Sequence, residues 1–177
     1  MPRVLSRLMM TATLVLAILG GTAVSAQDKY ELKSPSGIAL SDFRGYEDWS
    51  VVSSARTDEV LKVIIANPTM INAYKAGVPG NGQPFPEGSR IVKLQWKPKK
   101  STEAPFDVDV PDVFTQAFVI EKDSTRFPNT GGWGYALFNY DAKSDTFAAD
   151  AAPSDCGHAC HVAVKSKDYI FHPYQKR

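Results

Sequence analysis

The chain has 177 residues, with 20 basic and 19 acidic side chains, and a net charge of +1. This balance gives no electrostatic reason to expect nucleic acid or an anionic membrane surface as a partner. The length is enough for one domain with a real hydrophobic core and too short for two ordinary domains in addition to a leader. We therefore expect a single domain.

Residues 1–26 have the layout of a secretory signal peptide. Arg3 and Arg7 precede an apolar run over residues 8–19, and small residues ending in Ala26 follow. The run is too short to favour a stable membrane span. We expect cleavage after Ala26, which leaves residues 27–177 as the mature domain with no membrane anchor. In a bacterium, the exported chain would reside in the periplasm.

Five runs of β-branched and aromatic residues predict strands. They cover residues 49–55, 60–65, 91–96, 113–120 and 133–140. Turns rich in proline and glycine separate them, as in Pro79-Gly80-Asn81-Gly82. Strands joined by short turns favour an antiparallel sheet. The basic cluster of Lys97, Lys99 and Lys100 has no aromatic residues between its charges, so we expect it in a solvated loop between two strands.

Two short helices are predicted beside the strands. Asn67 is a suitable N-cap, Pro68 suits the first helical position, and Gly77 follows the end of the first helix. The second helix is expected over residues 156–164. These elements together predict an α+β fold, which is mainly an antiparallel β-sheet with a few short helices packed on it.

The segment Cys156-Gly157-His158-Ala159-Cys160-His161 carries the most specific chemistry of the chain. Two thiols followed at once by a histidine are typical of covalent haem attachment, in which thioethers form at the haem vinyl groups and the imidazole binds the iron. The usual motif has two residues between the cysteines, whereas this chain has three. The segment predicts haem c, with Cys156 and Cys160 as anchors and His161 as the axial ligand.

Two alternatives use the same residues. A disulfide between Cys156 and Cys160 would span Cα atoms about 6 Å apart on a helix, and its tiny loop would add little stability. Zinc would use both thiols and one or two of His158 and His161, but structural zinc sites usually draw on two separated pairs of ligands, and the sequence has no second pair. His158 is otherwise expected to be exposed.

Several further motifs resemble the cytochrome P-460 family, which includes the cytochromes c′-beta. They are Pro86-Glu87-Gly88 before residues 91–96, Thr130-Gly131-Gly132-Trp133-Gly134-Tyr135, and Lys167-Asp168-Tyr169-Ile170-Phe171 after Cys160-His161. The resemblance runs from about Tyr46 to Tyr174. It implies a small, sheet-rich, usually homodimeric c-type haem protein with five-coordinate iron. Such a protein either oxidises hydroxylamine, passing electrons to a c-type cytochrome, or binds nitric oxide.

The resemblance gives roles to single residues. His161 would be the proximal ligand, and Lys93 matches the lysine that hydroxylamine-oxidising members bond to a meso carbon of the porphyrin. Strand alternation puts Ile91, Lys93 and Gln95 on one face, which fits either a haem or solvent.

The other side of the haem is expected to be apolar. Residues 113–120 present Phe114, Gln116 and Phe118 on one face, which suits a gas-binding pocket. We expect Arg56 to be the polar distal residue, donating hydrogen bonds to a bound ligand. Asp112 and Glu121 are remote candidates for the base that hydroxylamine oxidation needs.

Two further classes of function remain. A six-coordinate electron-transfer cytochrome would need a second protein ligand, for which Met70 and His172 are the candidates in the mature chain. Met70 is expected in the core beside Ile71, on the first predicted helix. The other class is a sheet-rich binding module without a cofactor.

Overall fold

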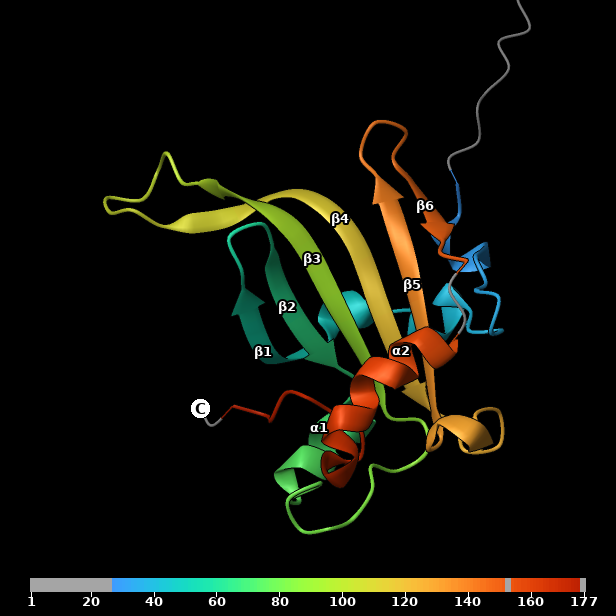
Figure 1. Cartoon of the computed structure of the whole chain (residues 1–177). Helices are drawn as coiled ribbons and strands as arrows, with labels where there is room; N and C mark the ends of the chain where they lie inside the picture. Colours follow the sequence, from blue (N-terminus) through green and yellow to red (C-terminus); the bar gives the residue numbers. More distant parts are fainter. Residues whose placement is uncertain (1–26, 152–153, 176–177) are drawn as a thin grey trace, which may run out of the picture.

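A computed structural model describes residues 27–151 and 154–175, so the predicted signal peptide lies outside the described residues. The fold is a six-stranded antiparallel sheet in which the strands follow one another in chain order (Figure 1). The strands are β1 (Ser50–Arg56), β2 (Leu61–Ala66), β3 (Arg90–Lys100), β4 (Asp109–Lys122), β5 (Trp133–Asp141) and β6 (Thr146–Ala149).

Short helices accompany the sheet, which confirms the predicted α+β class. The α-helices among the described residues are α1 (Pro68–Lys75) and α2 (Ser154–His161). The 3-10 helices are η1 (Lys29–Glu31), η2 (Leu40–Phe43), η3 (Tyr46–Asp48), η4 (Pro128–Thr130) and η5 (Val162–Lys167). Within the described ranges, no helix is both long enough and apolar enough to cross a membrane.

The long hairpin of β3 and β4 corrects one expectation. Lys97, Lys99 and Lys100 belong to β3 and do not form a loop. The ends of β3 and β4 pair as far as Lys100 and Asp109, and the Lys99 ammonium lies 3.0 Å from the Asp112 carboxylate. The charged end of β3 is therefore tied to acidic residues of its partner strand.

A β-irregularity corrects the predicted face of β4. Gln95 pairs with Gln116, but Trp96 pairs with Phe114, so the register skips one residue. A bulge of this kind moves the residue that follows it to the other face. Phe114 therefore packs against Trp96 on the face opposite Phe118, with ring centroids 5.4 Å apart, and the expected common face of Phe114 and Phe118 is wrong.

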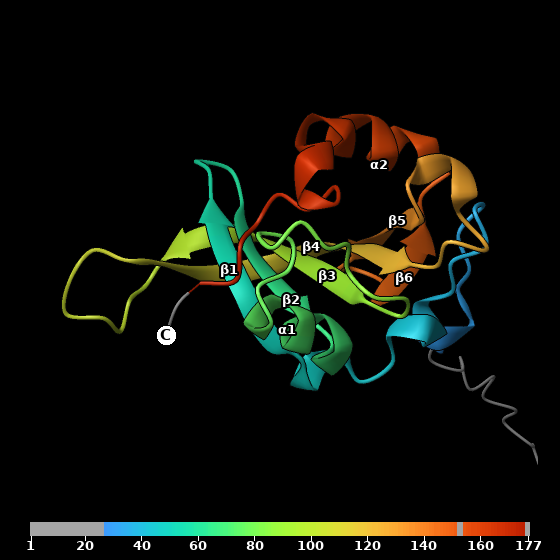
Figure 2. The ribbon, with the colours of Figure 1, turned by 90° about the horizontal axis from the view of Figure 1, so that it is seen from below.

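The N-terminal segment closes one face of the sheet. Figure 2 shows α2 on one side of the sheet and the short cyan helices on the other. The segment inserts four buried side chains, namely Ile38, Leu40, Phe43 and Tyr46. They pack in one core cluster with Val92, Val119 and Phe138 of the central strands. The chain's own side chains therefore fill this face over the central strands.

The other face is covered by α1, α2 and the C-terminal segment. As predicted, the Asn67 side chain caps α1 by accepting a hydrogen bond of 3.1 Å from the Met70 amide. Met70 and Ile71 are buried in the core cluster of this face, as expected for Met70. Helix α1 lies near the end of the sheet (Figure 1). Between the middle of the sheet and α2, the side chains leave a cavity.

Candidate functional site

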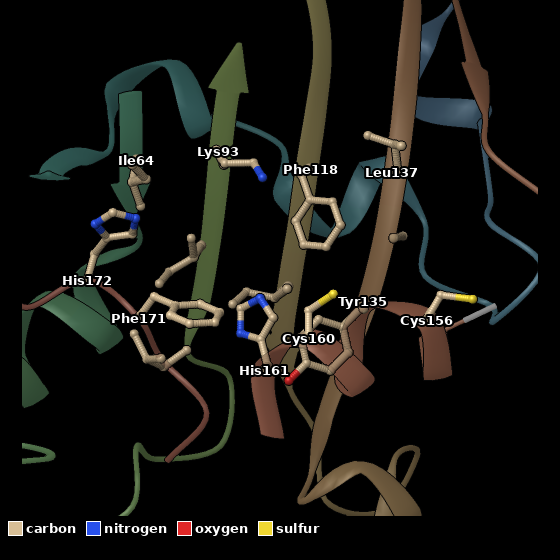
Figure 3. A pocket seen from close by; sticks show the side chains of 15 residues that line it. Ile64, Lys93, Phe118, Tyr135, Leu137, Cys156, Cys160, His161, Phe171 and His172 are labelled. Atoms are coloured by element: carbon tan, nitrogen blue, oxygen red, sulfur yellow. The ribbon is translucent and has the colours of Figure 1, made fainter. Parts of the chain in front are cut away.

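A cavity of about 400 Å³ lies between the sheet and the C-terminal segment (Figure 3). The volume falls in the range of small-molecule and cofactor sites. The sheet contributes mostly apolar side chains, including Ile64, Ile91, Lys93, Phe118 and Leu137. The C-terminal segment contributes Cys156, Cys160, His161, Phe171 and His172. The structure therefore gathers the predicted haem-binding residues Lys93, Cys156, Cys160 and His161 at one cavity, together with His172.

Helix α2 explains the unusual spacing of the cysteines. Residues four apart lie on one helix face, so Cys156 and Cys160 both line the cavity, and both thiols are free. Gly157 lies against β5, where an added Cβ would be 2.5 Å from the Cβ of Tyr135. The thiol that the usual motif would put at residue 157 therefore does not fit there without a shift, and residue 156 carries the cysteine in this chain.

His161 is held in one tautomer. Its Nδ1 lies 2.5 Å from the carbonyl oxygen of Tyr169. A carbonyl can only accept, so Nδ1 carries the proton and Nε2 keeps a free lone pair. Burial lowers the pKa of His161, although the hydrogen bond to Tyr169 partly opposes this, so the imidazole is neutral near pH 7. A neutral imidazole with an oriented second nitrogen is what a metal ligand requires.

Lys93 points into the cavity from β3 (Figure 3). Its Nζ lies 4.7 Å from the centroid of the Phe118 ring. Burial, and secondarily the charge of Lys62, lowers the pKa of Lys93. Burial also lowers the pKa of His172, with smaller effects from Lys93 and Lys62. The two basic side chains on the cavity wall therefore release their protons more readily than usual.

The structure places the other predicted polar residues away from the cavity. Arg56 ends β1 with its Nη2 2.6 Å from the Asp109 carboxylate. Asp112 is paired with Lys99, and Glu121 is buried with two arginines beside a different, polar cavity. Among the described lining residues of the apolar cavity there is no aspartate or glutamate.

His158 is half-buried, whereas the sequence suggested an exposed side chain. Its ring centroid lies 5.1 Å from that of Tyr169, and its Nδ1 has no hydrogen-bond partner within the described part of the chain. The Tyr135 hydroxyl is likewise buried and unpaired there. Sequence reasoning did not single out Tyr135 as a lining residue, although its place on β5 opposite the glycine of α2 puts it at the cavity wall.

The donor set fits haem better than the two alternatives. The cysteines are not joined to each other, and no three His, Cys, Asp or Glu side chains of the described ranges meet as a metal site, so zinc gains no support. Two thiols on one helix face, a neutral imidazole and apolar walls suit a flat macrocycle lying between sheet and helix.

The family described as Cytochrome P460 matches residues 43–172, well over half of the chain. The match covers the whole sheet and every lining residue of the cavity. No curated protein matches the sequence.

Proposed function

The chain belongs to the cytochrome P460 family of c-type haem proteins, and on that premise we propose that it is an exported mono-haem cytochrome that oxidises hydroxylamine. The observation that carries the proposal is the convergence of Cys156, Cys160, His161 and Lys93 on one apolar cavity. We further propose that the mature chain is periplasmic, forms a homodimer and passes electrons to a c-type cytochrome.

The cavity residues divide the task of holding the cofactor. Cys156 and Cys160 would hold the haem through thioether bonds, and Nε2 of His161 would bind the iron, because Nδ1 donates to the Tyr169 carbonyl. Haem held by these residues would supply a redox-active iron that can accept electrons from a small nitrogen compound.

Oxidation of hydroxylamine releases protons along with electrons, so the cavity needs proton acceptors. Lys93 and His172 suit this role because burial lowers the pKa of both side chains and favours their neutral forms. Phe118, Leu137 and Ile64 restrict water at the apolar wall. We also propose that Lys93 contacts the edge of the macrocycle. Whether Lys93 is bonded to a meso carbon is decided by the Lys93→Ala spectrum described below.

A second function is favoured by one observation. The absence of a carboxylate among the described lining residues, with Phe118 over the cavity, suits a protein that binds nitric oxide without oxidising hydroxylamine. The electron-transfer alternative has less support, because Met70 is buried in the core and does not line the cavity. His172 is left as the candidate second ligand.

The test is to produce the chain with c-type haem-maturation machinery and to compare the wild type with Cys160→Ala, His161→Ala and Lys93→Ala. We expect covalent haem in the intact mass of the wild type and a five-coordinate optical spectrum. We also expect hydroxylamine-dependent reduction of a c-type cytochrome, which Lys93→Ala lowers about 100-fold or more. Lys75→Ala is the matched control, since Lys75 is exposed at the end of α1 and does not line the cavity.

The outcomes separate the candidates. A Soret band that is strongly red-shifted in the ferrous wild type and ordinary in Lys93→Ala would establish the lysine bond. Nitric oxide binding without hydroxylamine turnover, and a spectrum that Lys93→Ala leaves unchanged, would favour the gas-binding function. A six-coordinate low-spin spectrum would favour electron transfer, and a haem-free mass would overturn all three.

A further inference from the structure

We propose that Lys122 and Asp168 are positioning residues for His161. Their buried ion pair fixes the turn whose carbonyl oxygen orients the imidazole. The inference rests on the proposed function, because it treats His161 as the iron ligand. Neither Lys122 nor Asp168 lines the cavity, so both would act through the Tyr169 carbonyl.

The ion pair is deeply buried and fully engaged. The Lys122 side chain is 7% exposed and that of Asp168 is 11% exposed. Lys122 Nζ lies 3.0 Å and 3.2 Å from the two Asp168 oxygens and donates to the Gly131 carbonyl at 2.9 Å. One Asp168 oxygen also accepts from the Phe85 amide at 2.8 Å. Removing either partner would leave an uncompensated charge in the interior.

The turn that carries the key carbonyl has an unfavourable backbone conformation. Asp168 and Tyr169 have φ values of 48° and 63°, in the left-handed region that residues with a Cβ rarely adopt. Local hydrogen bonds close the turn, from the Asp168 amide to Lys165 and from the Tyr169 amide to Val164. The Asp168 carboxylate adds bonds outside the turn, because it joins the turn to Lys122 of β4 and to the Phe85 amide.

A few contacts also connect the Lys122–Asp168 ion pair to the His161 imidazole. The Tyr169 ring packs on Gly131, where an added Cβ would lie 2.3 Å from the ring. Lys122 holds the carbonyl of that same Gly131. The Tyr169 carbonyl in turn accepts the Nδ1 proton of His161. Lys122 thus holds both Asp168, which precedes Tyr169, and Gly131, on which the Tyr169 ring packs.

A fixed hydrogen bond at the outer nitrogen of an axial histidine sets its tautomer and increases its basicity. A more basic imidazole stabilises ferric iron over ferrous iron. If the ion pair is broken, the turn relaxes, the hydrogen bond weakens and the reduction potential should rise. Loss of core packing alone would lower stability without this electronic signature.

The experiment compares matured holoprotein of the wild type with Lys122→Met and Asp168→Asn. We expect both variants to carry haem, with a higher reduction potential, a lower iron–histidine stretching frequency and hydroxylamine turnover reduced about 10- to 100-fold. Lys122→Arg keeps the charge and should restore the wild-type values. Glu121→Gln is the matched control, because Glu121 is adjacent on β4, equally buried and ion-paired, and lies away from the haem cavity.

Thermal unfolding of every variant separates stability from positioning. If Lys122→Met and Asp168→Asn lower the melting temperature but match Glu121→Gln in potential and stretching frequency, the pair is only structural and the inference is overturned. If either variant does not fold, Asp168→Glu, which keeps the charge and displaces it by one methylene, carries the same readouts. A wild type without haem would instead overturn the proposed function, and this inference with it.

Discussion

The two faces of the sheet are built from alternate residues of the same strands, but one face is covered by packed side chains and the other lines a cavity. Val92 is fully buried under the N-terminal segment, whereas its neighbour Lys93 lines the cavity. Likewise, Phe138 is completely buried, and Leu137 beside it faces the cavity. One face is filled by the chain's own side chains, and the other leaves a space shaped by apolar walls. The side chains of the filled face therefore serve packing alone, whereas several side chains of the other face both belong to a core cluster and line the cavity.

The largest expected difference between the faces is in stability. Phe138→Ala should lower the free energy of unfolding by about 3–5 kcal/mol, because the residue is fully enclosed and its removal leaves a void. Phe118→Ala should cost less than half as much in the haem-free chain, since one side of its ring faces the cavity instead of packed atoms. Urea denaturation of both variants without haem measures the two costs. Equal costs would mean that the cavity face is packed as tightly as the filled face.

Local signals predicted the parts of this fold that depend on local physics. The Asn67-Pro68 start of α1 depends on a cap and a fixed φ, and both are readable from two residues. Phe114 was assigned to the wrong face because the bulge depends on its pairing with Trp96, which no feature of residues 113–120 reveals. Strand β6 escaped prediction because it has four residues and pairs only with β5.

The site residues also differ in how far the sequence predicts them. The cysteines and His161 were predicted because they are contiguous and chemically specific. Arg56 was an expectation from residue type alone, and the structure places it beside Asp109. The Tyr169 carbonyl had no sequence signal at all, because every residue carries one and only the turn makes this one an acceptor for His161.

The second prediction concerns the close contact between Gly157 of α2 and Tyr135 of β5. Gly157→Ala should destabilise the protein by about 1–3 kcal/mol, because the added methyl group meets Tyr135 and pushes α2 away from β5. The displacement would also move both thiols, so covalent haem in the intact mass should decrease. Ala159→Ser, at an exposed position of α2, is the control and should stay within about 0.5 kcal/mol of the wild type. Full haem attachment in a stable Gly157→Ala variant would contradict the close-packing explanation.

The smallest effect concerns the charge on the cavity face. Burial lowers the pKa of Lys93 in the folded chain, so between that lowered pKa and the usual value of 10.5 the unfolded chain binds more protons. Stability should therefore rise with pH across this window, by about 1.4 kcal/mol for each unit that separates the two pKa values. Below the folded pKa, the charged ammonium is present in both states and its burial lowers stability.

Lys93→Met removes this contribution, so its unfolding free energy should rise less with pH than that of the wild type. Urea denaturation of the haem-free chain at several pH values below 10.5 measures the difference, and Lys75→Met, at the exposed end of α1, controls for the loss of one positive charge. Parallel pH profiles for wild type and Lys93→Met would mean that solvent reaches the ammonium freely. The cavity face would then lack the desolvation that gives Lys93 its proposed role, and the contrast between the two faces would be one of packing alone.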